Sequence, residues 1–253
     1  MKHPNTSSLP KAEAPKANIG VALRSAVFFL GQVLSTLAIA PLVLLSKSRP
    51  FEVRYGYAKL WVRFNLWVLA TVCGLRYEVR GMENMPASNG VILAKHQSTW
   101  ETFAFLCILP PVVFLLKQEL LQIPVWGRGL ATLEPIAIDR NAKTAALKQV
   151  MREGAARLQA GRWVVIFPEG TRIRPGKKGE YNASGSILAH RAGCPVVPVA
   201  HNAGKFWPPK SFLKFPGVIQ IRIGPAIDGS QHSAADINQL AEEWIEGQMA
   251  ELD

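Results

Sequence analysis

Cysteine is scarce in this sequence, and the few that occur are not spaced for cross-linking or metal binding. The 253 residues include 3 cysteines, Cys73, Cys107 and Cys194. Each lies among apolar residues, which predicts buried free thiols in a reducing compartment rather than a disulfide framework. His190 and His201 lie near Cys194 in the sequence, but this spacing matches no familiar zinc pattern, and we expect no metal ion.

Further absences narrow the class of protein. The sequence has no glycine-rich nucleotide loop and no internal repeat. Its basic patches stand beside no signature of DNA or RNA binding, so we expect no nucleic-acid partner. With 49% hydrophobic residues, the length fits one α/β domain with an appendage.

Acidic residues are few at the N-terminal end. Residues 1–80 hold 11 Lys and Arg against 3 Asp and Glu, whereas the remainder holds 18 against 15. Most of the formal net charge of +11 is therefore N-terminal. A basic segment can bind nucleic acid or anionic lipid, and the apolar residues around this one favour lipid.

One long run without formal charge extends from Ala26 to Leu45, between Arg24 and Lys47. Its 20 residues could span a hydrocarbon core of about 30 Å. Pro41 interrupts the run, however, and polar residues recur at helical spacing: Ser25, Gln32, Ser35 and Thr36. A spanning helix and a helix lying in the membrane interface therefore both stay open.

A second stretch, from Tyr57 to Val72, has the pattern of a membrane-surface helix. Its apolar residues share one helical face, and charged residues lie near its start. The face contains Leu60, Trp61, Phe64, Trp67 and Val68, and the charges are Arg54, Lys59 and Arg63. We therefore predict a disordered leader at 1–18 and two membrane-associating helices at 19–75.

Two other interpretations of these helices stay open. Ala38–Ala40 resembles a signal cleavage site, although the preceding segment is long for a charged leader. Both stretches could also be ordinary core helices. Aromatic residues close to basic ones, at Tyr55, Tyr57 and Trp61, favour an interfacial belt instead.

Residues 76–253 alternate short apolar runs with longer helical patterns, which predicts an α/β catalytic domain. We expect strands at 90–94, 112–116, 135–138, 163–167, 195–200 and 218–223. We expect helices at 99–109, 143–160, 184–191 and 233–252. This rhythm indicates a mostly parallel or mixed central sheet flanked by helices, preceded by the two-helix membrane-associating segment.

Polar clusters follow three of the predicted strands. They are Lys95–Glu101, Asp139–Asn141 and Pro168–Arg172. In sheets of this class, functional residues gather where strands end at their carboxyl edge. The three clusters therefore predict the position of a site.

The first cluster pairs a histidine with a carboxylate. His96 ends a strand and Glu101 lies in the first turn of the next helix, so an imidazole held by a carboxylate could act as a general base. Ser98-x-x-Glu101 is also a helix capping box, and His96 could be a mere loop histidine. The motif alone leaves these alternatives open.

The Pro168–Arg172 cluster reads PEGTR and offers a glycine, a hydroxyl and a guanidinium that can bind phosphate with two hydrogen bonds. Arg174, Lys177 and Lys178 extend the positive field. The alternative is a surface turn with a solvated arginine. The occurrence of the PEGTR run together with the histidine cluster favours a functional site.

The sequence resembles the glycerolipid acyltransferase family, whose best-known members are the lysophosphatidic acid acyltransferases. The resemblance covers roughly residues 75–225. It is based on four blocks in the expected order: His96–Glu101 (HQSTWE), Ile136–Arg140 (IAIDR), Phe167–Arg172 (FPEGTR) and Val197–His201 (VPVAH). The family pattern has Asp where this chain has Glu101.

The resemblance implies roles for individual residues. His96 would be the base and Glu101 would orient it, while the acceptor hydroxyl attacks a thioester directly. The glycerol phosphate would be held by Lys117, Arg140, Glu169, Gly170, Thr171 and Arg172. No serine or cysteine nucleophile is then needed, and the sequence has no Gly-x-Ser-x-Gly elbow.

The resemblance also implies the reaction and the partners. A fatty acyl group would pass from acyl-CoA or acyl carrier protein, both substrates rather than cofactors, to lysophosphatidic acid, giving phosphatidic acid. The enzyme would bind the bilayer at the cytoplasmic face, the inner membrane in a bacterium. An acyltransferase for another lyso-lipid, such as a lyso-aminolipid, and an inactive lipid-binding protein stay open as alternatives.

Overall fold

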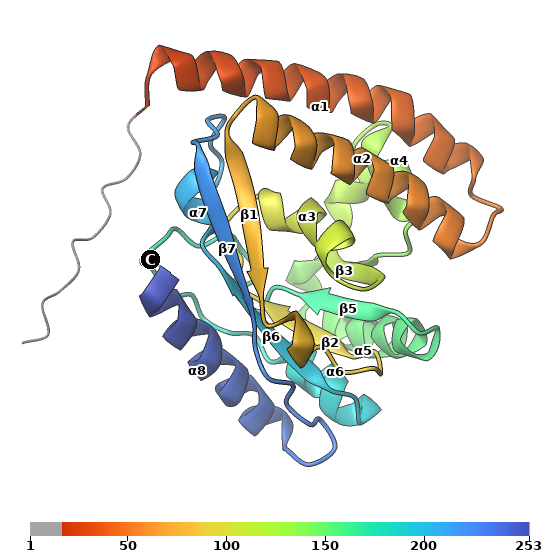
Figure 1. Cartoon of the computed structure of the whole chain (residues 1–253). Coiled ribbons are helices and arrows are strands. Elements are labelled where there is room, and N and C mark those ends of the chain that lie inside the picture. Colours follow the sequence, from red (N-terminus) through yellow and green to blue (C-terminus); the bar gives the residue numbers. More distant parts are fainter. Residues whose placement is uncertain (1–16, 253) are drawn as a thin grey trace, which may run out of the picture.

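A computed structural model describes residues 17–252, except for the side chains of Arg140 and Lys143. The predicted leader at 1–18 lies almost entirely outside these residues. Within the described part, one mixed sheet has the order β1-β7-β6-β2-β5-β3-β4 (Figure 1). Its strands are β1 (Leu75–Arg80), β2 (Val91–Ala94), β3 (Val112–Lys117), β4 (Ile136–Ile138), β5 (Trp163–Ile166), β6 (Val196–His201) and β7 (Gly217–Ile223).

The sheet is parallel apart from one strand pair. Only β6 and β7 run antiparallel among the described strands. The central strands β2, β5 and β6 are buried along their whole length, as expected for parallel strands covered on both faces. From β2 the chain continues to β3, β4 and β5, which all lie on one side of β2 in the sheet. After β5 it crosses to β6, on the other side of β2. This switch point opens a crevice at the carboxyl end of β2.

Helices α5 (Lys143–Gln159), α6 (Ser184–Ala192) and α8 (Ala234–Leu252) cover one face of the sheet (Figure 1). The buried residues of α8 recur every fourth position and form one apolar stripe: Ile237, Ala241, Ile245 and Met249. This stripe seats the helix against β6 and α6. The C-terminal helix is therefore an integral layer of the domain.

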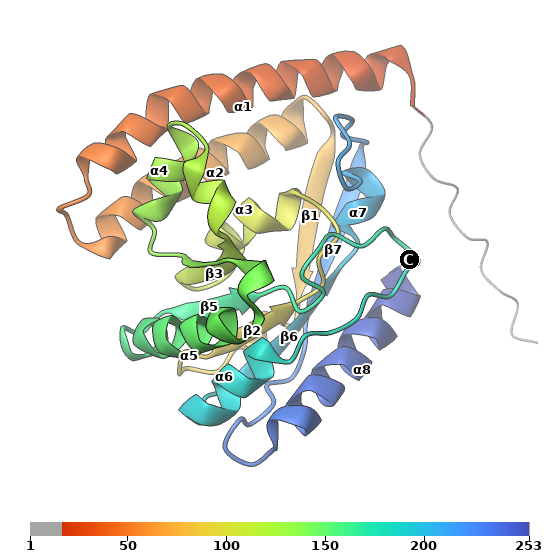
Figure 2. The same ribbon diagram turned by 180° about the vertical axis from the view of Figure 1, so that it is seen from behind.

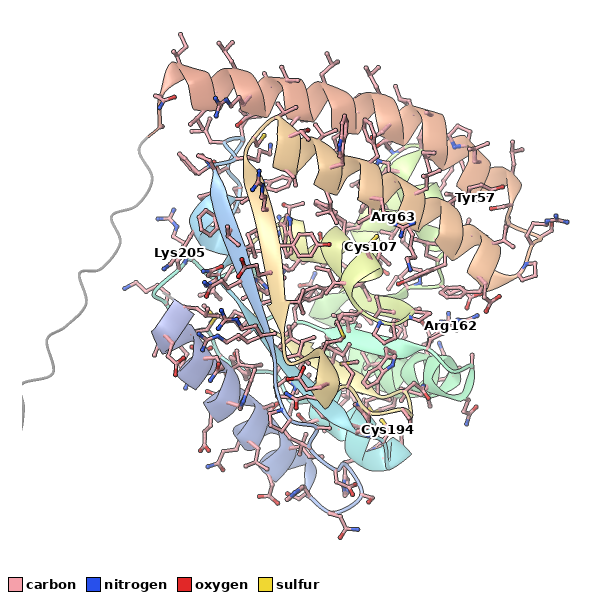
Figure 3. All side chains as sticks on the ribbon, viewed as in Figure 1. Tyr57, Arg63, Cys107, Arg162, Cys194 and Lys205 are labelled. Atoms are coloured by element: carbon pink, nitrogen blue, oxygen red, sulfur yellow. The ribbon has the colours of Figure 1, made fainter. Side chains whose placement is uncertain are left out.

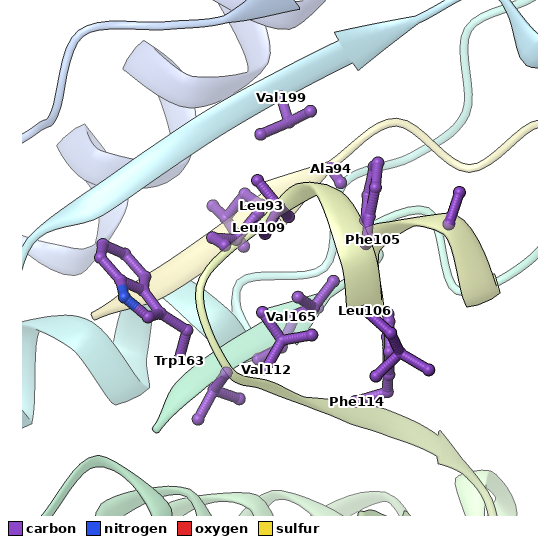
Figure 4. Packing of buried hydrophobic residues seen from close by; sticks show 14 of the residues in the cluster. Leu93, Ala94, Phe105, Leu106, Leu109, Val112, Phe114, Trp163, Val165 and Val199 are labelled. Carbon is purple, nitrogen blue, oxygen red and sulfur yellow. The ribbon is translucent and has the colours of Figure 1, made fainter. Parts of the chain in front are cut away.

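The other face carries α3 (Trp100–Ile108), with α2 (Phe51–Thr71) and then α1 (Ile19–Leu45) further out (Figure 2). Short helices α4 (Trp126–Ala131) and α7 (Ala203–Phe206) lie at its margins. Beneath α3, the side chains of Phe105 and Leu106 lie over β2, β3 and β5 (Figure 4). Because these side chains pack against the sheet, the position of α3 is fixed. The loop between β2 and α3 is held in place at the same time.

The two N-terminal helices lie side by side. Val62 and Leu69 of α2 are fully buried in the main hydrophobic core. Trp61 Nε1 donates to Thr36 Oγ1 at 3.1 Å, and Asn65 Nδ2 donates to Ser35 Oγ at 3.3 Å, so the polar residues of α1 face α2. Helix α1 is long and apolar enough to cross a membrane by length and composition, and it continues through Pro41.

The predicted fold class is confirmed, as are the six predicted strands and four catalytic-domain helices to within one or two residues. Strand β1 was missed because its sequence LRYEVR is mostly exposed at the sheet edge and forms no apolar run. The cysteines are free thiols, as predicted. Cys107 and Cys194 lie far apart (Figure 3), and both are half-buried rather than buried.

Candidate active site

Neighbouring parallel strands bring the predicted residues to one edge of the sheet. The His96 loop follows β2, the Phe167–Arg172 loop follows β5, and Lys117 ends β3. Because β2 pairs with β5 and β5 pairs with β3, all in parallel, their carboxyl ends open onto the same side. The loops therefore meet at the switch-point crevice.

His96 and Glu101 form a hydrogen-bonded dyad. Nδ1 of His96 lies 2.9 Å from Oε1 of Glu101. The Glu101 side chain is fully buried, whereas that of His96 is 12% exposed. Because a carboxylate only accepts, Nδ1 carries the hydrogen, and in the neutral form of the ring Nε2 has the lone pair. An imidazole in this state can take a proton from a hydroxyl.

Glu101, the second residue of α3, also accepts backbone N–H groups of the segment just before that helix. Its Oε1 accepts the backbone N–H of Gln97 at 3.0 Å and that of Ser98 at 2.7 Å. In return, Ser98 Oγ accepts the N–H of Trp100 at 3.2 Å. The orienting role and the capping role, alternatives on sequence alone, therefore share one carboxylate oxygen.

The charge of Glu101 is maintained by its neighbours. Burial acts to raise the pKa of its carboxyl. The rings of His201 and His96 and the N–H of Ser98 act in the opposite direction, and the net effect lowers the pKa of Glu101 below its ordinary value. A negative charge next to His96 favours the imidazolium that general-base catalysis creates.

The loop after β5 clamps the His96 residue. Oε2 of Glu169 accepts the His96 N–H at 2.9 Å, and the His96 carbonyl accepts the Ile173 N–H at 2.7 Å. The imidazole also stacks on the Phe167 ring, with centroids 4.1 Å apart. The base and the loop that contains the Pro–Glu–Gly–Thr–Arg run therefore form one unit.

Within this loop, Gly170 turns the chain and Arg172 lies half-buried. Gly170 has φ +64°, in the left-handed region that favours glycine, and donates its N–H to Phe167 O at 3.0 Å. Nε of Arg172 is buried and has no hydrogen-bond partner among the described residues. An orphaned guanidinium N–H suits an anionic ligand such as a phosphate. Thr171 is exposed beside it.

The structure describes the other predicted phosphate-binding residues to different extents. Lys117 is exposed at the end of β3. The Arg140 side chain lies outside the described part of the chain, so its role stays a prediction. Both oxygens of Glu169 are engaged by Lys95 and His96, and the contact predicted between Glu169 and glycerol phosphate also stays a prediction.

Sequence reasoning named Lys95 in the first polar cluster and His201 in the fourth block without a role for either at the site, and it missed Glu246. Lys95 is fully buried and contacts Glu169, Glu246 and the Lys177 carbonyl. The buried His201 donates from Nε2 to the Lys95 carbonyl at 2.8 Å and accepts the Ala203 N–H at Nδ1, which makes it the neutral tautomer. The one signal in the sequence for this buried group was a lysine directly after a wholly apolar strand. Glu246 has no such signal, because it lies in an amphipathic helix among other charged residues.

Two cavities open beside the dyad loops. One, of about 650 Å³, lies between α1, α2, α3 and the segment 123–133 and is mostly apolar. Thr99 and Thr102, close to His96 in sequence, line its wall. The other, of about 560 Å³, is lined by Phe167, Gly170 and residues of α5 and α6. No group of His, Cys, Asp and Glu that could hold a metal ion occurs within residues 17–252.

The chain belongs to the Acyltransferase family, whose model matches residues 76–202. It is 46% identical over 242 residues to a 1-acyl-sn-glycerol-3-phosphate acyltransferase of Pseudomonas aeruginosa, a match covering 91% of this chain and 92% of that protein. It is 30% identical over 198 residues to the Escherichia coli protein of the same name, covering 73% and 77% of the two chains.

A solved structure has the same fold. The crystal structure of a 1-acyl-sn-glycerophosphate acyltransferase from Thermotoga maritima matches with a TM-score of 0.73, covering 92% of this chain and 96% of that one. At 23% sequence identity, the match concerns the fold alone.

Proposed function

We propose that this protein transfers a fatty acyl group from a thioester to the free hydroxyl of lysophosphatidic acid, giving phosphatidic acid. One observation carries the proposal: the His96–Glu101 dyad is clamped to the loop that contains Arg172, whose buried Nε has no hydrogen-bond partner among the described residues. This supports a base and an anion-binding group that are held together by one loop. The names of the relatives in P. aeruginosa and E. coli support lysophosphatidic acid as the acceptor.

In the proposed reaction, Nε2 of His96 takes the proton from the acceptor hydroxyl as its oxygen attacks the thioester carbonyl. Glu101 stabilises the resulting imidazolium. Collapse of the tetrahedral intermediate breaks the carbon–sulfur bond, and His96 returns the proton to the departing thiolate. Arg172, with Lys117 and Arg140, binds the acceptor phosphate, while the thiol belongs to coenzyme A or acyl carrier protein.

The apolar cavity between α1, α2 and α3 fits the hydrocarbon part of a substrate. Each buried methylene group contributes about 0.8 kcal/mol to binding. The cavity lies under the outer face of α1, whose side chains Leu30 and Leu34 are 59% and 57% exposed. This supports an α1 that lies in the membrane interface, so that substrates enter from the bilayer. We propose that this interface is at the cytoplasmic face of the membrane.

The proposal is tested with purified protein, a radiolabelled acyl donor and a panel of lyso-lipids. We expect labelled phosphatidic acid from lysophosphatidic acid at a rate well above that for any lyso-aminolipid. Acyl-CoA and the acylated form of acyl carrier protein are supplied as donors in separate reactions. A faster rate with another lyso-lipid would replace the proposed acceptor, and no transfer to any of them would leave a lipid-binding protein.

Arg172→Ala tests the phosphate site in the same assay. Because the guanidinium is proposed to bind only the acceptor, the variant should raise the KM for lysophosphatidic acid far more than the KM for the thioester. Steady-state kinetics with each substrate varied in turn measure both values. Equal changes in the two KM values would contradict this assignment.

A further inference from the structure

A fully buried lysine lies directly behind the catalytic dyad. Lys95 Nζ donates to Glu169 Oε1 at 2.7 Å, to Glu246 Oε1 at 2.8 Å and to the Lys177 carbonyl at 3.3 Å. An ammonium group has three N–H donors, and all three are used. Removing a charge from water is costly unless it is paired and hydrogen-bonded, so these acceptors are what allows Lys95 to be buried here.

The second carboxylate comes from the C-terminal helix. Glu246 lies on α8, and its Oε1 also accepts the hydroxyl of the buried Tyr181 at 2.8 Å. The family match ends at residue 202, so Glu246 lies outside it. Helix α8 therefore contributes a partly buried carboxylate, with its side chain 20% exposed, to the contacts behind the site.

The lysine connects this helix to the backbone of the base. Glu169 accepts from Lys95 with one oxygen and from the His96 N–H with the other, at 2.9 Å. The Lys95 carbonyl is held in turn by His201 Nε2 at 2.8 Å. A continuous set of contacts thus runs from α8 through Lys95 and Glu169 to His96.

We propose that Lys95 and Glu246, with Tyr181, are positioning residues of the active site. The Lys95 ammonium fixes the orientation of the Glu169 carboxylate, and this carboxylate fixes the backbone of His96. Helix α8 supplies Glu246, one of the three hydrogen-bond acceptors of the ammonium. Without the Glu246 carboxylate, a buried N–H of Lys95 lacks its partner, and the ammonium must shift toward other acceptors and take Glu169 with it. Turnover as a readout of this inference depends on the proposed function.

The test compares Glu246→Ala with Glu242→Ala, one helical turn earlier on α8. Alanine removes the acceptor for Lys95, whereas the amide oxygen of a glutamine would keep it. Glu242 pairs with Lys178, which is 59% exposed, so it also ties α8 to the loop after the arginine, but at the surface, where an ion pair contributes little. Turnover, both KM values, melting temperature and deuterium exchange of the 95–101 segment are measured. Glu246→Gln is carried alongside as the conservative variant that keeps an acceptor oxygen.

Because misplacing a catalytic group by about 1 Å costs about 10²-fold, we expect Glu246→Ala to lower kcat by roughly 10- to 100-fold. Both KM values should stay within about twofold, and exchange at 95–101 should become faster. Glu246→Gln should lose less activity than Glu246→Ala, and Glu242→Ala should match the parent protein in every measurement. The inference is overturned if kcat is unchanged in Glu246→Ala, or if kcat falls without faster exchange at 95–101.

The experiment also distinguishes an incorrect proposed function from an incorrect positioning role. A parent protein that does not acylate lysophosphatidic acid would refute the function, whereas the exchange comparison needs no activity. In that case, faster exchange in Glu246→Ala but not in Glu242→Ala would support the positioning contacts, and equal exchange in these two variants would overturn them.

Discussion

His96 has one ring nitrogen committed to Glu101 and the other free for chemistry, and its backbone is held on both sides by the Phe167–Arg172 loop and the residue after it. Such restraint matters because a general base must lie within hydrogen-bond distance of the proton it abstracts. Four separate contacts, two with the backbone and two with the ring, restrict the imidazole. The site is thus organised around a single side chain.

His96→Ala should lower turnover by roughly 10²- to 10⁴-fold, the usual loss when general acid–base help is removed. The fold should survive because the His96 backbone contacts do not depend on the imidazole. Turnover with saturating donor and acceptor, together with the melting temperature, provides the check. A near-normal kcat in a folded variant would contradict the mechanism.

Glu101→Gln separates the two functions of that carboxylate. An amide oxygen can still accept the N–H groups of Gln97 and Ser98, so the melting temperature should stay within a few degrees of the parent. The lost negative charge no longer supports the imidazolium, so most acyl transfer should disappear.

Glu101→Asp is the matched variant because it restores the family's usual residue and keeps the charge. It should retain part of the activity despite its shorter reach. Turnover and melting of the two variants are compared side by side. An active Gln variant would make Glu101 a cap only, and His96 would then need another orienting partner.

At the scale of the elements, α1 has two chemically different sides. Its polar residues Ser35 and Thr36 bond to α2, whereas its opposite side is apolar and exposed. A helix with one side bound to the protein along its length suits insertion into a single membrane interface. The same geometry explains why hydropathy alone left spanning and interfacial insertion open.

Leu30→Glu combined with Leu34→Glu should therefore reduce sedimentation with anionic lipid vesicles and leave the melting temperature nearly unchanged. Both side chains are more than half exposed, so the folded state loses little packing. Leu240→Glu on α8, where the side chain is 40% exposed, provides the control and should sediment like the parent. Unchanged vesicle binding of the double variant would place the membrane contact elsewhere.

At the scale of the whole molecule, Lys214 joins α1 to the catalytic domain. The residue is 3% exposed, and its Nζ lies 4.5 Å from the Trp207 ring centroid and 5.1 Å from that of Phe28. Its backbone N–H donates to Ser25 Oγ of α1 at 2.9 Å. Burial lowers the pKa of Lys214 to about 8, and Cys73 opposes this only in part.

This lowered pKa predicts how stability depends on pH. Below about pH 8 the lysine is protonated in both states, and the folded state carries the full cost of a buried ammonium. Between about 8 and the ordinary value of 10.5 the unfolded state binds more protons, so the free energy of unfolding rises with pH.

Lys214→Met should remove this contribution while keeping the aromatic contacts. Melting curves of parent and variant, recorded from pH 7 to pH 11, should converge or cross in favour of the parent as pH rises. The difference between the two proteins cancels the titration of groups that they share. Parallel melting temperatures across the range would contradict a buried, depressed lysine.

The sequence by itself determined the order of most strands and helices, because buried parallel strands and amphipathic helices differ in their apolar period. It also determined which residues compose the dyad and the phosphate-binding loop, since their short spacing along the chain forces proximity. It could not reveal β1, whose edge position leaves its side chains polar and exposed. It also left the capping and orienting roles of Glu101 as alternatives.

Only the tertiary structure decided what lies behind the site. Lys95 and Glu246 are separated by most of the catalytic domain in sequence, yet their side chains meet at 2.8 Å. Sequence periodicity records whether a residue faces the core or solvent, but it carries no information on which distant partner neutralises a buried charge. That pairing depends on how α8 packs across β6, and packing between elements is a property of the folded chain.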